Sequence, residues 1–143
     1  MQLIHAPIHS VAPNAIRIDL KVDRLQLAKR RWRGIADDGQ EFGFDLEHPL
    51  HDGSVFFAKD TDVYRIEQLP EPVIDVTLPS NPTSAARIGW LLGNLHFPVE
   101  LHAGCLRVND DPAVRQLLER EHIQHELTEG TFHPISGAHS HAH

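Results

Sequence analysis

A pair of prolines divides this chain into two stretches with different patterning. Leu69-Pro70-Glu71-Pro72 can sustain neither a helix nor a central strand, because proline lacks the backbone N–H that both need. Strand-like alternation dominates before this segment, whereas strand-like and helix-like runs follow one another after it. We therefore predict domains at residues 1–69 and 73–133, followed by a tail at residues 134–143. Each domain is small enough to be marginally stable alone, which favours docking of the halves or dimerisation.

The first stretch has the pattern of short strands joined by turns. Residues 16–22 alternate apolar and polar side chains, as a half-buried strand does. Asp38-Gly39 and Asp52-Gly53 are hairpin turn signals, and apolar residues follow each of them. The one helical hint is a turn within residues 25–29. We predict a small all-β domain, either a sandwich or a barrel. Such a domain could bind a peptide or partner protein by adding a strand to an exposed edge, which is a further alternative function.

The second stretch predicts a mixed α and β domain. Its elements are a strand at 73–78, a helix beginning at Asn81-Pro82, strands at 98–102 and 105–108, a helix beginning at Asp111-Pro112, and a strand at 126–132. Asn and Asp before Pro are typical of helix N-termini. The order β-α-β-β-α-β is that of the ferredoxin-like arrangement, so the predicted fold class of the whole chain is α+β.

Charge and hydropathy restrict the partners. The net charge of −7 argues against nucleic acid as the main partner. One basic cluster at residues 29–33 is the exception, and we expect it to be the charged face of an edge strand or turn. No apolar run approaches the roughly 20 residues of a membrane span, and the N-terminus lacks the features of a secretory signal. The expected location is the cytoplasm.

If this chain binds a transition metal, we expect nitrogen and not sulfur ligands, because histidine is far more frequent than cysteine or methionine. The chain has 12 histidines against one cysteine, Cys105, which excludes an internal disulfide and a thiolate zinc cage. His139, His141 and His143 alternate with small residues at the end of the chain, so an extended tail would place all three rings on one side. We interpret this segment as a flexible metal-binding tail. The alternatives are a solvated terminus or the remnant of an affinity tag, although such tags are usually unbroken runs.

His96 lies in a second notable segment, Gly93-Asn94-Leu95-His96-Phe97-Pro98. Gly93 can close the preceding helix in the left-handed conformation, which Asn94 also tolerates, and Pro98 prevents the helix from resuming. The turn between them directs His96 away from the helix end. Taken alone, His96 is an ordinary helix-terminal histidine. On a two-fold axis, however, two copies of it would meet.

This segment resembles the Gly-Asn-Arg-His-x-Pro motif of urease accessory proteins of the UreE type, which are nickel metallochaperones. The predicted β domain, the ferredoxin-like domain and the histidine-bearing tail after Phe132-His133-Pro134 agree with that family. The resemblance implies a homodimer in which His96 of both subunits holds one Ni(II) as cargo. It also implies that the tail histidines assist, and that nickel passes on within a complex of urease and its accessory GTPase.

The chain departs from the family pattern in three places. Leu95 replaces the usual arginine, which affects local charge or partner contacts but not the ligand. A further His-x-His site of some members has no counterpart, because residues 109–111 are Asn-Asp-Asp. The tail is short, so its capacity is a few ions at most.

Two other functions remain as alternatives to a nickel carrier that is not an enzyme. A metal-dependent hydrolase would need three fixed ligands and an open coordination position, and no His-Glu-x-x-His helix is present. A general divalent-metal buffer would use the same histidines, and Zn(II) or Cu(II) would compete for them. His102 and His133 remain open as contributors to the metal site. We expect structural or solvated roles for the other histidines, which are His5, His9, His48, His51, His122 and His125.

Overall fold

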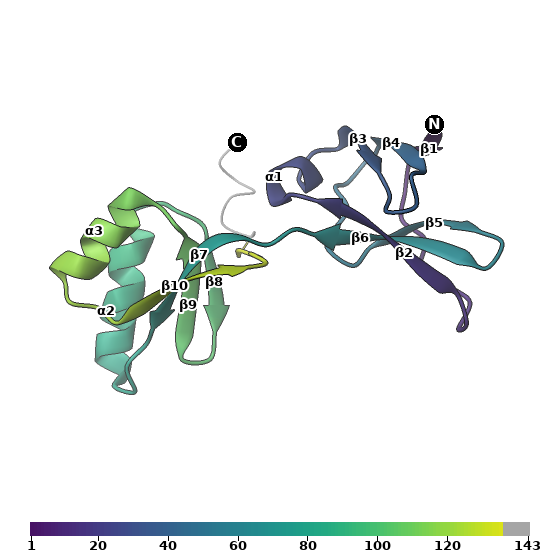
Figure 1. Ribbon diagram of the computed structural model, residues 1–143. Coiled ribbons are helices and arrows are strands. Elements are labelled where there is room, and N and C mark those ends of the chain that lie inside the picture. Colours follow the sequence, from purple (N-terminus) through teal and green to yellow (C-terminus); the bar gives the residue numbers. More distant parts are fainter. Residues whose placement is uncertain (136–143) are drawn as a thin grey trace. The chain divides into compact units, whose positions relative to one another are not determined.

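The computed structural model describes residues 1–135, in which ten strands and three helices form two compact units. The first unit is Met1–Leu69, and the second begins at Pro70 (Figure 1). Sheets predominate in both units, and the predicted mixed α and β fold class is confirmed. None of the helices within residues 1–135 has the length and apolar character needed to cross a membrane.

The first unit contains two three-stranded sheets and one turn of helix. Its elements are β1 (Gln2–Ile4), β2 (Ile16–Val22), α1 (Arg24–Leu27), β3 (Arg31–Ile35), β4 (Glu41–Asp45), β5 (Val55–Lys59) and β6 (Asp62–Gln68). The strand orders are β1-β4-β3 and β2-β6-β5, with β1 parallel to β4 and β2 parallel to β6. The one helical turn, α1, overlaps the possible turn predicted within residues 25–29. The Asp23 side chain accepts a hydrogen bond from the Gln26 N–H and caps α1.

Aromatic rings fill the core of the first unit. Phe42 is fully buried, and its ring contacts those of Phe44, Phe56, Phe57 and Tyr64. Phe42 and Phe44 lie on one face of β4, as the alternation predicts, whereas Phe56 and Phe57 are consecutive residues of β5, where the register shifts. The core therefore depends on ring packing between the two sheets.

A hydrogen bond joins Tyr64 of this core to the Asp38-Gly39 turn. The buried Tyr64 hydroxyl donates to Asp38 Oδ2 at 2.5 Å, and this bond raises the pKa of Tyr64 to about 12 while lowering that of Asp38. Gly39 has a φ of 92°, so the turn has the conformation that glycine adopts without strain. The predicted turn is confirmed.

The second unit is one antiparallel sheet covered on one face by two helices (Figure 1). Its elements are β7 (Glu71–Thr77), α2 (Pro82–Gly93), β8 (Val99–His102), β9 (Cys105–Asn109), α3 (Pro112–Arg120) and β10 (His125–Gly130), and the strand order is β10-β7-β9-β8. The Asn81 side chain accepts bonds from the Thr83 and Ser84 N–H groups, and Asp111 accepts one from Ala113. Both helices thus begin at the predicted caps.

The expectation that no central strand includes the proline segment is wrong for Pro72. It lies inside β7, which is a central strand. Pairing of β7 with β9 begins only at Val73, so Pro72 lies beyond the end of that ladder. Its missing N–H therefore removes no hydrogen bond to β9, which is why a proline is tolerated here.

Candidate metal centre

His96 is the residue at which the backbone reverses direction after α2. Helix α2 ends at Gly93, and Asn94 still has a right-handed φ of −67°. The N–H groups of Leu95 and His96 donate to the carbonyls of Leu92 and Gly93, each at 3.1 Å, and tighten this last turn. The left-handed residue is His96, with a φ of 61°, so the expectation that Gly93 takes this conformation is wrong. Histidine is one of the residue types enriched in this region.

The neighbours of His96 are anchored while its own side chain is exposed. Leu95 and Phe97 are half-buried and pack against the core formed by the sheet and both helices. Because the chain reverses between these two anchors, the imidazole of His96 is held outside the core. The backbone at this position is thus fixed before any ligand arrives, which favours metal binding.

His122 shows that this backbone geometry is not specific to a metal ligand. It follows α3 as His96 follows α2, with a φ of 54° and an exposed side chain. The N–H groups of His122 and Ile123 donate to the carbonyls of Glu119 and Leu118 at 3.2 and 2.9 Å. A left-handed histidine therefore closes both helices of this unit, and His96 needs further support as a ligand.

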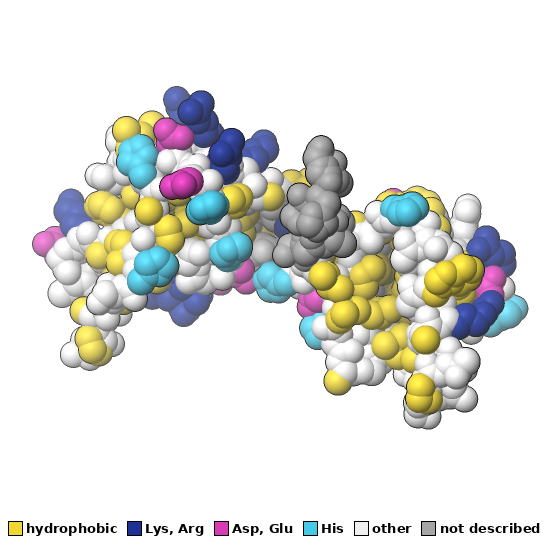
Figure 2. Space-filling model, turned by 180° about the vertical axis from the view of Figure 1, so that it is seen from behind, with side chains coloured by type: hydrophobic (Ala, Val, Ile, Leu, Met, Phe, Trp, Pro, Cys, Tyr) yellow, Lys and Arg dark blue, Asp and Glu magenta, His cyan; other side chains and the backbone are white. Residues whose placement is uncertain are grey.

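Large apolar side chains are exposed on the elements before and after the His96 turn. Trp90 on α2 is 65% exposed and Leu101 on β8 is 62% exposed. Figure 2 shows hydrophobic side chains gathered on one face of the second unit. Exposed aromatic and aliphatic side chains of this size are typical of protein interfaces.

The sheet face that carries no helices holds a polar network. Arg107 on β9 donates to both oxygens of Asp75 on β7, at 2.8 and 3.0 Å, and these bonds hold the pKa of Asp75 below its usual range. Arg107 Nη1 also donates to the Thr131 carbonyl at 3.1 Å. A Cβ on Gly130 would lie 2.5 Å from that nitrogen, so only glycine lets the guanidinium lie here.

This network guides the chain after β10 across the sheet to its opposite edge. Glu100 on the edge strand β8 accepts a hydrogen bond from the His133 N–H at 2.6 Å, and its other oxygen bonds the ring of His102. The Ile135 N–H then donates to the Val99 carbonyl at 2.8 Å. The last described residue therefore lies against Val99, three positions along the chain from His96.

The described residues contain no complete metal site within one chain. Over residues 1–135, no three side chains of His, Cys, Asp or Glu are close enough together to hold an ion. Burial raises the pKa of the Cys105 thiol, which disfavours the thiolate that binds metals. His139, His141 and His143 lie outside the described residues.

Comparison with known proteins identifies the family. The model of the UreE urease accessory protein C-terminal domain matches residues 71–143. A urease accessory protein UreE of Pseudomonas fluorescens (strain SBW25) is 34% identical over 147 aligned residues, covering 100% of this chain and 86% of that protein. The chain belongs to the UreE family. A UreE of Cupriavidus necator is 30% identical, covering 99% of this chain and 77% of its own length.

Family membership settles the broad role. UreE proteins are named as urease accessory proteins, so this chain is an accessory protein of urease maturation and not an enzyme. The alternative of a metal-dependent hydrolase is thereby excluded. A UreE of Burkholderia ambifaria, 33% identical over 93% of this chain, carries the same name.

Proposed function

We propose that this UreE protein carries nickel for urease assembly and holds one Ni(II) between His96 of two subunits. The observation that supports this most is the exposed imidazole of His96 on a turn whose flanking residues are packed into the core. One fixed imidazole cannot hold an ion tightly, and residues 1–135 contain no group of three ligands. The remaining ligands must come from a second copy or from the tail. Imidazole nitrogens suit Ni(II), and also Cu(II) and Zn(II) as competitors.

A homodimer would supply the second His96. In an isologous interface the same patch of both subunits meets at the two-fold axis, so a residue near the axis meets its own copy. Trp90 and Leu101 flank His96 in the sequence and are largely exposed, so pairing of this surface would remove apolar area from water. We propose that this surface is the dimer interface.

The position of Ile135, the last described residue before the tail, supports a role for the tail histidines. An extended chain spans at most about 3.6 Å per residue, so four residues from Ile135 carry His139 up to about 14 Å. By the same limit on chain length, the three residues from Val99 to His96 span at most about 11 Å. Since the Ile135 N–H is hydrogen-bonded to the Val99 carbonyl, the tail can reach His96 of its own subunit. In this proposal the tail gathers nickel and completes the site.

Delivery would take place in the cytoplasm, within a complex of urease and its accessory GTPase. A titration of the full chain with Ni(II), followed by native mass spectrometry, tests the carrier site. We expect a dimer with one tightly bound ion and a few weaker ones. Monomers that each bind one ion tightly would contradict the shared site.

A transfer assay separates delivery from storage. Nickel-loaded protein should activate apo-urease in the presence of the accessory GTPase faster than the same amount of Ni(II) supplied on a small chelator of equal affinity. Dimers that load nickel but give no activation beyond this chelator control would show a metal buffer instead of a carrier.

Replacing Glu100 with alanine tests whether the hydrogen bond that holds His133 to β8 matters for metal binding. The variant loses the acceptor of the His133 N–H, so the tail explores a larger volume and its effective concentration at His96 falls. We expect nickel sites that depend on the tail to weaken by about three- to tenfold, while the melting temperature changes little. Isothermal titration gives the affinities, and hydrogen exchange at the His133 amide reports the anchor.

Two variants control for this result. Glu100→Gln keeps an oxygen acceptor and should retain most of the affinity. Glu126→Ala removes an exposed carboxylate from β10 and should change nothing. If Glu126→Ala weakens nickel binding as much as Glu100→Ala does, loss of negative charge and not loss of the anchor explains the effect.

A further inference from the structure

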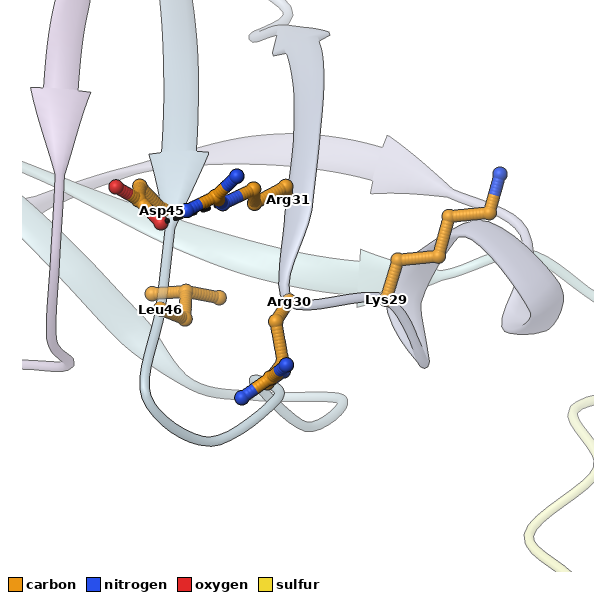
Figure 3. A pocket seen from close by; sticks show the side chains of 5 residues that line it. All are labelled: Lys29, Arg30, Arg31, Asp45 and Leu46. Atoms are coloured by element: carbon orange, nitrogen blue, oxygen red, sulfur yellow. Dashed lines mark hydrogen bonds and ion pairs between the residues drawn. The ribbon is translucent and has the colours of Figure 1, made fainter.

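A basic hollow lies on the first unit, beside the strand that carries the basic cluster. It has a volume of about 520 Å³, and Lys29, Arg30, Arg31, Asp45 and Leu46 line it. In Figure 3, Arg31 reaches along the sheet toward Asp45, whereas Arg30 and Lys29 extend from the segment before β3 without a partner among the labelled residues. The metal-carrier proposal assigns no role to these residues.

The charges of this hollow are largely uncompensated. The chain has a net charge of −7, yet four of the five residues from Lys29 to Arg33 are basic. Arg31 forms an ion pair with Asp45 at 3.0 Å. Within residues 1–135, no ion pair or side-chain hydrogen bond is made by Lys29, Arg30 or Arg33. The cluster is thus a local concentration of positive charge on a chain whose net charge is negative.

An apolar hollow adjoins the basic one. It measures about 500 Å³ and shares Arg31 and Asp45 with the first hollow. Gly43 forms part of its floor, and the tips of Met1 and Leu3 occupy the space that a Cβ on Gly43 would need. Met1 and Leu3 are 63% and 56% exposed, so they offer an apolar surface to a ligand. Arg33 lines the same hollow and carries the positive charge into it.

We propose that the two hollows form one groove that binds an acidic peptide segment of a partner protein. Carboxylates of the segment would pair with Arg30 and Arg33, and an apolar side chain would lie against Leu3. The unpaired arginines match an acidic ligand. Because one end of the groove is apolar, the groove should prefer segments in which Asp or Glu is next to Leu or Met. This proposal does not depend on nickel binding.

The same features favour a peptide over nucleic acid. Asp45 lies where the two hollows join, and its carboxylate would repel a continuous row of phosphates. Single-stranded nucleic acid also needs exposed rings on which bases stack. The aromatic residues that line the groove are buried, with Trp32 7% and Phe44 3% exposed.

Fluorescence anisotropy with a labelled octapeptide, Glu-Asp-Leu-Glu-Glu-Asp-Leu-Glu, tests the groove on the full chain. We expect saturable binding that weakens with added salt and falls at least about tenfold in the double variant Arg30→Glu, Arg33→Glu. The control is Arg17→Glu, Lys59→Glu, which changes the net charge equally in the same unit. Equal losses in both double variants would show attraction by net charge alone and overturn the proposal.

Two further measurements define the ligand class. Replacing the two leucines of the octapeptide by serine should weaken binding to the parent but not to Leu3→Ser, because that variant has already lost the apolar contact. A single-stranded oligonucleotide of the same charge should bind more weakly than the peptide. If it binds more tightly and depends on the same arginines, the groove is a nucleic-acid site. Nickel stoichiometry should stay unchanged in every variant.

Discussion

Alanine at position 96 is expected to abolish the tight nickel site that we propose for a dimer of this chain. Each dimer would lose both fixed imidazoles, leaving only ligands on the tails. Even a hydrogen-bond partner of a metal ligand contributes about 10–100-fold to affinity, so loss of the ligands should weaken the tight site by about a hundredfold or more. Competition titration against a chelator measures this loss, and native mass spectrometry checks that the dimer persists.

His122→Ala is a matched control for that variant. His122 has the same left-handed conformation as His96, closes the other helix of the same unit, and is also exposed. Both substitutions should therefore change the free energy of unfolding by similar small amounts. Only His96→Ala should lose nickel. A comparable loss in both variants would mean that the helix ends, and not the ligand, control binding.

Replacing Phe42 with alanine should unfold the first unit selectively. The Phe42 ring is fully buried among other aromatic rings, and deletion of such a ring costs about 3–5 kcal/mol. That loss is a large part of the stability of a small domain. Because all of these contacts lie within Met1–Leu69, the second unit should keep its stability and the nickel binding that we propose for it.

The two tryptophans make this result measurable unit by unit. Trp32 lies in the first unit and Trp90 in the second, so Trp90→Phe and Trp32→Phe backgrounds report each unit separately during urea unfolding. Leu118→Ala, a fully buried position in the second unit, should give the opposite pattern. If Phe42→Ala lowers the midpoints of both units equally, they unfold as one cooperative body.

Local patterns explain why most elements could be predicted from the sequence. Residues 16–22 alternate as β2 requires, and Asn81-Pro82 and Asp111-Pro112 carry the caps of α2 and α3. These features depend on neighbours a few residues away. The parallel pairing of β1 with β4 and of β2 with β6 joins distant segments instead, and alternation alone does not choose the partner strand.

At the candidate site, too, contacts with distant residues could not be predicted from the local sequence. Gly93 is the residue that local propensity favours for the left-handed position, but packing of Leu95 and Phe97 moves that position to His96. The role of Glu100 was missed, because nothing local relates it to a backbone amide 33 residues later. Its only signal in the sequence was an acidic residue between two apolar ones on an edge strand.

The hydrogen bond between Ile135 and Val99 also protects the sheet from unwanted association. Strand β8 is an edge strand, and an unpaired edge offers its backbone to the edge of another molecule. Ile135 occupies one of those backbone positions. A truncation that tests the proposed role of the tail histidines should therefore keep Ile135. A chain cut before Ile135 would also leave the edge of β8 unpaired, and its aggregation could be mistaken for a defect in nickel binding.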